Sequence, residues 1–136
     1  MTYRVIFYHK QATSARTRFL KFQDETICAP GPLPKLSQIV KYHSNSLIHP
    51  ASVLSQMEKI LGFERGTLEA EGEYLQTVEV PGETIQIILA NVATMDPPFD
   101  LAEKIGASFI DLTQARALPQ VELELLRFAY ELVLGG

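Results

Sequence analysis

The sequence of 136 residues contains one cysteine, no tryptophan and no long apolar run. Because Cys28 has no second cysteine to pair with, it can form neither an intramolecular disulfide nor a cysteine-based metal site, which favours a reducing compartment. The first residues have neither the pattern of a signal peptide nor the length of a membrane span. We therefore expect a soluble, cytoplasmic protein that does not interact with a membrane.

Motifs that would identify a cofactor or a reaction are also missing. Gly31 stands alone among prolines, so there is no glycine-rich phosphate loop, and no nucleophile elbow surrounds a serine. The three histidines have no spacing that favours a shared metal ion. Cys28 is expected to be a small loop residue and not a nucleophile. The sequence thus predicts no catalytic residue, no metal and no cofactor.

The composition that remains is that of a globular domain. Apolar residues make up 46% of the chain, and aromatic residues 9%. A chain of this length is expected to bury one core, and neither a linker nor an internal repeat divides it. We expect a single domain over residues 1–136.

Strand patterns dominate the first part of the chain. Residues 3–10 and 17–22 are rich in β-branched and aromatic residues and predict two antiparallel strands. Three prolines predict an extended loop over residues 29–35. Residues 36–43 fit either a short helix or a strand.

The later elements alternate between amphipathic helices and apolar strands, most of them bounded by proline or glycine. Strand 84–92 is apolar on both faces, so we expect it at the centre of its sheet. The order predicts an α+β fold, a mixed or antiparallel sheet with helices packed on it. The expected elements are a helix from Pro50 to Gly62, strands 68–80 and 84–92 joined by a turn at Pro81 and Gly82, a short helix that starts at Asp96 and ends at Gly106, a strand at 107–112, and a last helix after Leu118 and Pro119. The last helix has a broad apolar face, which we expect to pack on the sheet or on a partner.

Residues 57–63 read Met-Glu-Lys-Ile-Leu-Gly-Phe at the end of a helix, and residues 107–112 are followed by Ala-Leu-Pro at 117–119. In these features and in the order of its elements, the chain resembles the later two-thirds of a Nudix domain. The resemblance covers most of the chain by element order more than by residue identity. It implies a Nudix-like α/β/α sandwich.

The motif of that family, G-x5-E-x7-R-E-u-x-E-E-x-G-u with u aliphatic, clusters glutamates on one helix to hold divalent cations against a diphosphate. When the motif is aligned on Gly62, Lys59 and Ile60 replace the paired metal-binding glutamates, and only Met57, Gly62 and Phe63 match. A lysine repels a cation. The resemblance therefore implies a degenerate member that lacks the Nudix box, and metal-dependent hydrolysis at this helix is not expected.

Charge is divided unevenly along a chain whose net charge is −4. Up to Pro50 there are seven Lys or Arg and two acids, and after it five Lys or Arg and fourteen acids. This polarity fits an anion-binding face on the first part, two halves that attract each other within the fold or across a dimer, or simply solvated charge. The predicted ligand-binding residues, expected to line a cleft between the first strands and the helix after Pro50, are Arg16, Arg18, Lys21, Lys35, Lys41, His43 and His49.

Three functions are weighed on these grounds. The preferred hypothesis is a non-catalytic, Nudix-like binding domain, a homodimer, that recognises a small anion through the phosphate or carboxylate fork that arginine offers. One alternative is a divergent metal-dependent hydrolase of nucleoside diphosphate derivatives that uses Glu64, or Glu69, Glu71 and Glu73, which alternate along a strand and would share a face. The other is a structural module that pairs through its last helix. Nucleic acid is not expected as a partner, because the sequence pI is near 5.3.

Overall fold

The computed structural model describes residues 3–40 and 49–135. These residues form an α+β fold, a mixed and mostly antiparallel sheet of eight strands with three helices. The strands are β1 (Tyr3–Lys10), β2 (Thr17–Lys21), β3 (Cys28–Ala29), β4 (Gln38–Val40), β5 (Leu68–Ala70), β6 (Gln76–Val80), β7 (Glu83–Val92) and β8 (Ser108–Ile110). The helices are α1 (Pro50–Leu61), α2 (Phe99–Lys104) and α3 (Gln120–Gly135), and η1 (Leu112–Gln114) is a 3-10 turn. Among the described residues, no helix has both the length and the apolar character that a membrane crossing requires.

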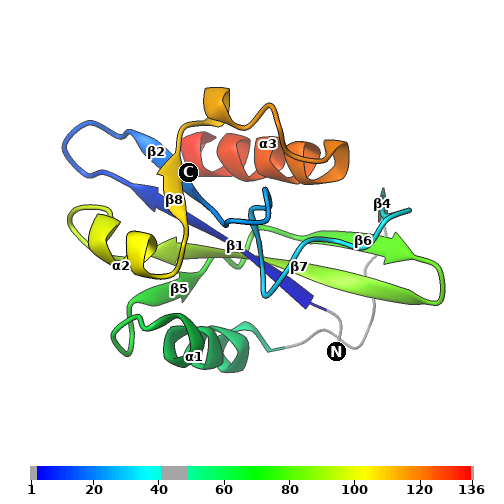
Figure 1. Cartoon of the computed structure of the whole chain (residues 1–136), viewed down its shortest axis with the longest axis horizontal. Helices are drawn as coiled ribbons and strands as arrows, with labels where there is room; N and C mark the ends of the chain where they lie inside the picture. Colours follow the sequence, from blue (N-terminus) through cyan, green and yellow to red (C-terminus); the bar gives the residue numbers. More distant parts are fainter. Residues whose placement is uncertain (1–2, 41–48, 136) are drawn as a thin grey trace.

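The strand order β4-β6-β7-β1-β2-β8 places β1 inside the sheet, while β3 pairs with β1 and β5 with β7. β1 runs parallel to β7 and antiparallel to β2, and β2 runs antiparallel to β8. The carboxyl ends of β1, β7 and β8 therefore meet the start of β2 at one end of the sheet (Figure 1). We call this end the carboxyl rim; it consists of Gln11, Arg16, Arg18, Asp96 and Asp111.

Helices cover both faces of the sheet, with α3 on one side and α1 and α2 on the other (Figure 1). Because side chains alternate along a strand, β1 contributes to two cores. Ile6 and Tyr8 pack on the α3 side, while Val5 and Phe7 pack on the side of α1 and α2. The apolar face of α3, which the sequence left free to meet the sheet or a partner, is buried within this chain. Its buried apolar residues are Leu125, Leu126, Ala129 and Val133.

Local sequence signals placed several elements correctly. β1 and β2 pair antiparallel, as predicted. α1 begins at Pro50 and is capped by Gly62 at a φ of 87°, the left-handed conformation that glycine adopts without strain. β7 lies between β6 and β1, inside the sheet. In the region left open between helix and strand, Gln38–Val40 forms a strand.

The expectation of one long strand over residues 68–80 is wrong. β5 ends at Ala70 and β6 begins at Gln76, and both pair with β7. Two polar contacts hold the intervening segment: the Tyr8 hydroxyl donates to the Glu71 carboxylate, and the Tyr74 hydroxyl donates to the Leu125 carbonyl at 2.8 Å. Each contact comes from a residue far away in sequence, whereas Gly72, which lies in a turn between the two strands, is a break signal within the segment itself.

The prediction that Cys28 is a loop residue is also wrong. Cys28 belongs to β3, pairs with Ile6 of β1 and is 1% exposed. Burial, followed by the negative charge of Glu122, raises the pKa of its thiol well above the ordinary value. This environment disfavours the thiolate form of Cys28.

A buried carboxylate ties the start of α3 to the turn between β2 and β3. Glu122 is 1% exposed. It accepts hydrogen bonds from the Thr26 hydroxyl at 2.8 and 2.9 Å and from the Ile27 backbone N–H at 3.0 Å. Both donors are buried, so the carboxylate accepts the hydrogen bonds that water would accept from them at the surface.

We expect Glu122→Ala to lower the free energy of unfolding by about 2 kcal/mol or more, because each buried donor left without an acceptor costs about 1–3 kcal/mol. Urea denaturation measures the change. Glu131→Ala, which alters an exposed acid of the same helix, is the matched control and should stay within about 0.5 kcal/mol of the parent. Equal unfolding midpoints for the two variants would contradict this role of Glu122.

Candidate functional site

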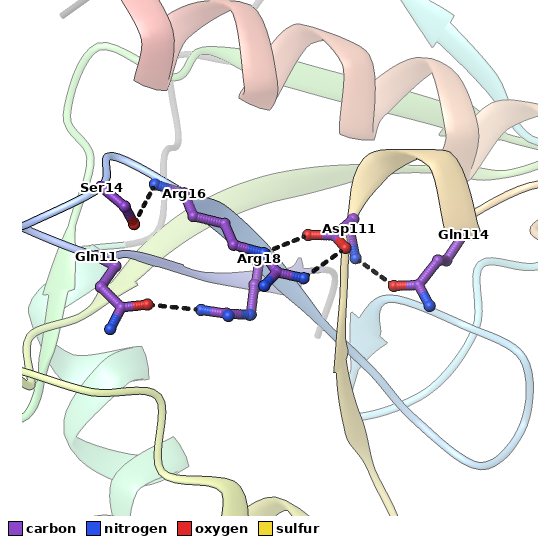
Figure 2. Close-up of polar contacts among 6 residues, drawn as sticks. All are labelled: Gln11, Ser14, Arg16, Arg18, Asp111 and Gln114. Carbon is purple, nitrogen blue, oxygen red and sulfur yellow. Dashed lines mark hydrogen bonds and ion pairs between the residues drawn. The ribbon is translucent and has the colours of Figure 1, made fainter.

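The carboxyl rim brings two arginines at the start of β2 to the aspartate that follows β8. Arg16 Nε and Nη2 donate to Asp111 Oδ1 and Oδ2 at 3.1 and 2.8 Å, a bidentate ion pair (Figure 2). The register explains this contact: Phe19 lies opposite Ile110, so the arginines before Phe19 reach the residue after Ile110. The pair is open to solvent, with side-chain exposures of 53% for Arg16 and 34% for Asp111.

Arg18 lies beside this pair but has different partners. Its Nη1 donates to Gln11 Oε1 at 3.0 Å (Figure 2), and its guanidinium lies 5.6 Å from the centre of the Phe99 ring. That ring packs edge-on against Phe109 of β8, with 5.9 Å between ring centres. Among the described residues, Gln11 is the one hydrogen-bond acceptor of Arg18. Since a guanidinium carries five N–H donors, Arg18 retains donors that no described side chain uses.

Neighbouring loops fix the position of these side chains. Gln11 Nε2 donates to Asp96 Oδ1 at 3.1 Å, which links the β1–β2 turn to the loop after β7. Asp96 therefore binds Gln11, while the short helix expected to start at Asp96 starts at Phe99. The buried His9 ring contacts the same loop, with Nε2 2.8 Å from the Thr94 carbonyl oxygen. These two contacts join the end of β1 and the β1–β2 turn to the loop that leads from β7 to Phe99 of α2.

The charges at the rim favour each other's ionised forms. The hydrogen bonds from Arg16 hold the pKa of Asp111 below its ordinary value, and the positive charges of Arg16 and Arg18 lower it further. Asp111 in turn raises the pKa of Arg16, through the same hydrogen bonds and its charge. Asp111 consequently stays negative to a lower pH than a free aspartate does.

Several of the predicted ligand-binding residues lie elsewhere. Lys21, at the other end of β2, forms an ion pair of 3.1 Å with Glu25. Lys35 is exposed in the loop between β3 and β4. Lys41 and His43 lie outside the described residues. The structure therefore brings Arg16 and Arg18 together without Lys21 or Lys35.

His49 belongs to a different region of the molecule. It precedes α1 and lines a cavity of about 330 Å³ together with Gln86. Gln86 pairs with Tyr3 at the amino end of β1, whereas Arg18 pairs with His9 at the carboxyl end. His49 and the two arginines thus lie at opposite ends of β1, and they do not share the cleft that the sequence led us to expect.

The helix at which the Nudix resemblance would place a metal site has a different chemistry. Lys59 and Ile60 are exposed, while the buried Glu58 accepts a hydrogen bond from the Leu68 backbone N–H at 2.9 Å. The three alternating acids do not lie on one strand, because β5 ends at Ala70; Glu71 accepts from the Tyr8 hydroxyl, and the charges of Glu71 and Glu69 both act on that hydroxyl. Among residues 3–40 and 49–135, no three His, Cys, Asp or Glu side chains gather as a metal ion would require.

The sequence predicted Arg16 and Arg18 as ligand-binding residues but did not predict the partners that surround them. Asp111, Gln11 and Phe99 are all absent from the predicted site. The one signal available for Asp111 was its place at the end of a predicted strand, which becomes informative only when the neighbouring strands are known. No sequence signal would have identified Phe99 as the platform of Arg18.

Comparisons with known proteins assign no family to the chain. No model of a known protein family matches the sequence, and no curated protein matches it significantly. The account of this site accordingly rests on its own geometry.

We expect the Asp111 carboxyl group to titrate below the ordinary range of aspartate in carbon-detected NMR, and Arg16→Gln to move its pKa upward, because the variant removes both hydrogen bonds and a charge. Lys21→Gln is the matched control, since Lys21 pairs with Glu25, and it should leave Asp111 unchanged. An Asp111 pKa that is the same in the parent and in Arg16→Gln would show that the bidentate pair is not formed in solution.

Proposed function

We propose that this chain is a non-catalytic binding domain, Nudix-like in fold, that recognises a small phosphate- or carboxylate-bearing anion at the carboxyl rim. Arg18 and Arg16 are the residues proposed to bind the anion. Phe99 and Gln11 are proposed to orient the Arg18 guanidinium.

The observation that carries this proposal is the environment of Arg18. This guanidinium is half-buried, lies against an aromatic ring and has a neutral amide oxygen as its hydrogen-bond acceptor. A guanidinium that is held in place and keeps unused donors is suited to charge-assisted hydrogen bonds with a phosphate or carboxylate. Its held position also reduces the conformational entropy that is lost on binding.

The location supports the same interpretation. In open α/β sheets, ligands bind beyond the carboxyl ends of the strands, where loops can surround them without interrupting the sheet. Three strands of this sheet, β1, β7 and β8, end at the carboxyl rim. Loops after each of them supply contacts, through Gln11, Asp96 and Asp111.

The Nudix-like part of the proposal rests on architecture alone. Its supports are helices on both faces of a mixed sheet, the parallel pair β1 and β7 at its middle, and α1 placed before the β6–β7 hairpin. Lys59 and Ile60, which stand where the family has acids, favour ligand binding without metal-dependent hydrolysis. The homodimer stays a prediction that light scattering would test; Phe128 and Leu134 are the large apolar side chains of α3 that remain exposed.

Thermal unfolding with inorganic phosphate tests the site. At about ten times the Kd, a ligand that binds the native state stabilises it by about 1.4 kcal/mol, which raises Tm by roughly 5 °C for a domain of this size. We expect this rise in the parent protein and its loss in Arg18→Gln, with Tm measured relative to each variant in chloride of equal ionic strength.

Arg127→Gln, on the exposed side of α3, removes the same charge away from the rim and should keep the full rise. Phosphate also stabilises proteins through exclusion from their surface, so the difference between variants decides the outcome. An equal rise in Arg18→Gln and in the parent would contradict the proposal.

A further inference from the structure

Arg16 already holds an anion, the carboxylate of Asp111. Both carboxylate oxygens accept from the guanidinium, through Nε at 3.1 Å and Nη2 at 2.8 Å. An incoming carboxylate would offer Arg16 the same two acceptors in the same geometry. The ion pair is exposed, so a ligand can reach it from solvent, but the ligand must first displace Asp111.

The competitor is attached to the protein. Asp111 follows β8, whose register with β2 places it beside Arg16 and Arg18, and its own N–H is held by Gln114 Oε1 at 2.8 Å. Even a flexible tether gives a group an effective concentration of about millimolar. The sheet pairing holds Asp111 closer than such a tether would. A free monocarboxylate has the same charge and the same two acceptor oxygens as Asp111, so it gains little binding free energy by displacing Asp111 from Arg16.

A phosphate monoester differs in charge and in shape. It carries a charge of about −1.5 to −2 at neutral pH and three terminal oxygens. Two of these can take the place of the Asp111 oxygens on Arg16, while the third remains for the unused donors of Arg18. A phosphate can thus engage both arginines together, whereas a single carboxylate replaces one interaction with an equal one.

We propose that the Asp111 carboxylate competes with ligands for the Arg16 guanidinium, and that the ligand class of the carboxyl rim is the dianionic phosphate group, bound by Arg16 and Arg18 together. This inference rests on the anion-binding function proposed above. In such a two-state site, every ligand that needs Arg16 is weakened by the fraction of molecules in which Arg16 is free. Removing the competitor therefore raises the affinity for phosphate and the affinity for acetate by the same factor. The preference for phosphate over acetate depends on Arg18.

NMR titrations with inorganic phosphate and with acetate test this arrangement in four proteins: the parent, Asp111→Asn, Glu83→Gln and Arg18→Gln. Asp111→Asn should lower the Kd of phosphate about threefold or more, because the neutral amide no longer competes for Arg16. Glu83→Gln removes the same charge from an exposed acid at the start of β7, at the end of the sheet opposite the carboxyl rim, and it should change the Kd less than twofold. The parent should prefer phosphate to acetate, and Arg18→Gln should abolish that preference.

The outcomes separate this inference from the function on which it rests. If Arg18→Gln abolishes phosphate binding while Asp111→Asn leaves the Kd unchanged, the rim binds anions but Asp111 is no competitor. If acetate binds the parent as tightly as phosphate does, the ligand class is wrong. If neither anion gives saturable shifts in the parent or in Asp111→Asn, the proposed function and this inference both fail.

Discussion

The parallel pairing of β1 with β7 is the constraint on which the site depends. It runs from Tyr3 opposite Gln86 to Tyr8 opposite Asn91, and it places the carboxyl ends of both strands beside the start of β2. Both faces of β1 are apolar, so hydrophobic burial alone would tolerate a slip in register. The contacts of the Tyr8 hydroxyl with Glu71 and of His9 with the loop after β7 are specific to one register. These polar contacts therefore fix the alignment that creates the rim.

At the rim, Arg16, just before β2, and Arg18, within β2, have different partners. Arg16 meets a carboxylate that matches both its charge and its fork, whereas Arg18 meets an amide oxygen and an aromatic face. The first arrangement satisfies its guanidinium, and the second orients a guanidinium without neutralising it. Under the proposed function, the Arg18 guanidinium, which keeps unused donors, would attract a small anion, and Asp111, whose charge interacts with both arginines, would limit that attraction.

The sequence predicted those parts of the fold that depend on neighbouring residues. The limits of α1 follow from Pro50 and Gly62, and the antiparallel pair β1 and β2 follows from adjacent β-rich segments. The contact of Tyr8 with Glu71 and the ion pair of Arg16 with Asp111 join residues that are 63 and 95 positions apart. Such contacts follow from strand order and register, which the pattern of a single chain does not encode locally. For the same reason the seven predicted site residues could be chosen by charge but not assigned to one location.

The most direct test of the central claim, that the carboxyl rim binds the anion, is chemical-shift mapping of the parent protein with inorganic phosphate, including the Nε–H signals of the arginines. The account predicts that the largest saturable shifts fall on the Arg16 and Arg18 side chains and on the Asp111 amide. Shifts that concentrate around the cavity beside His49, at the opposite end of β1, would contradict it.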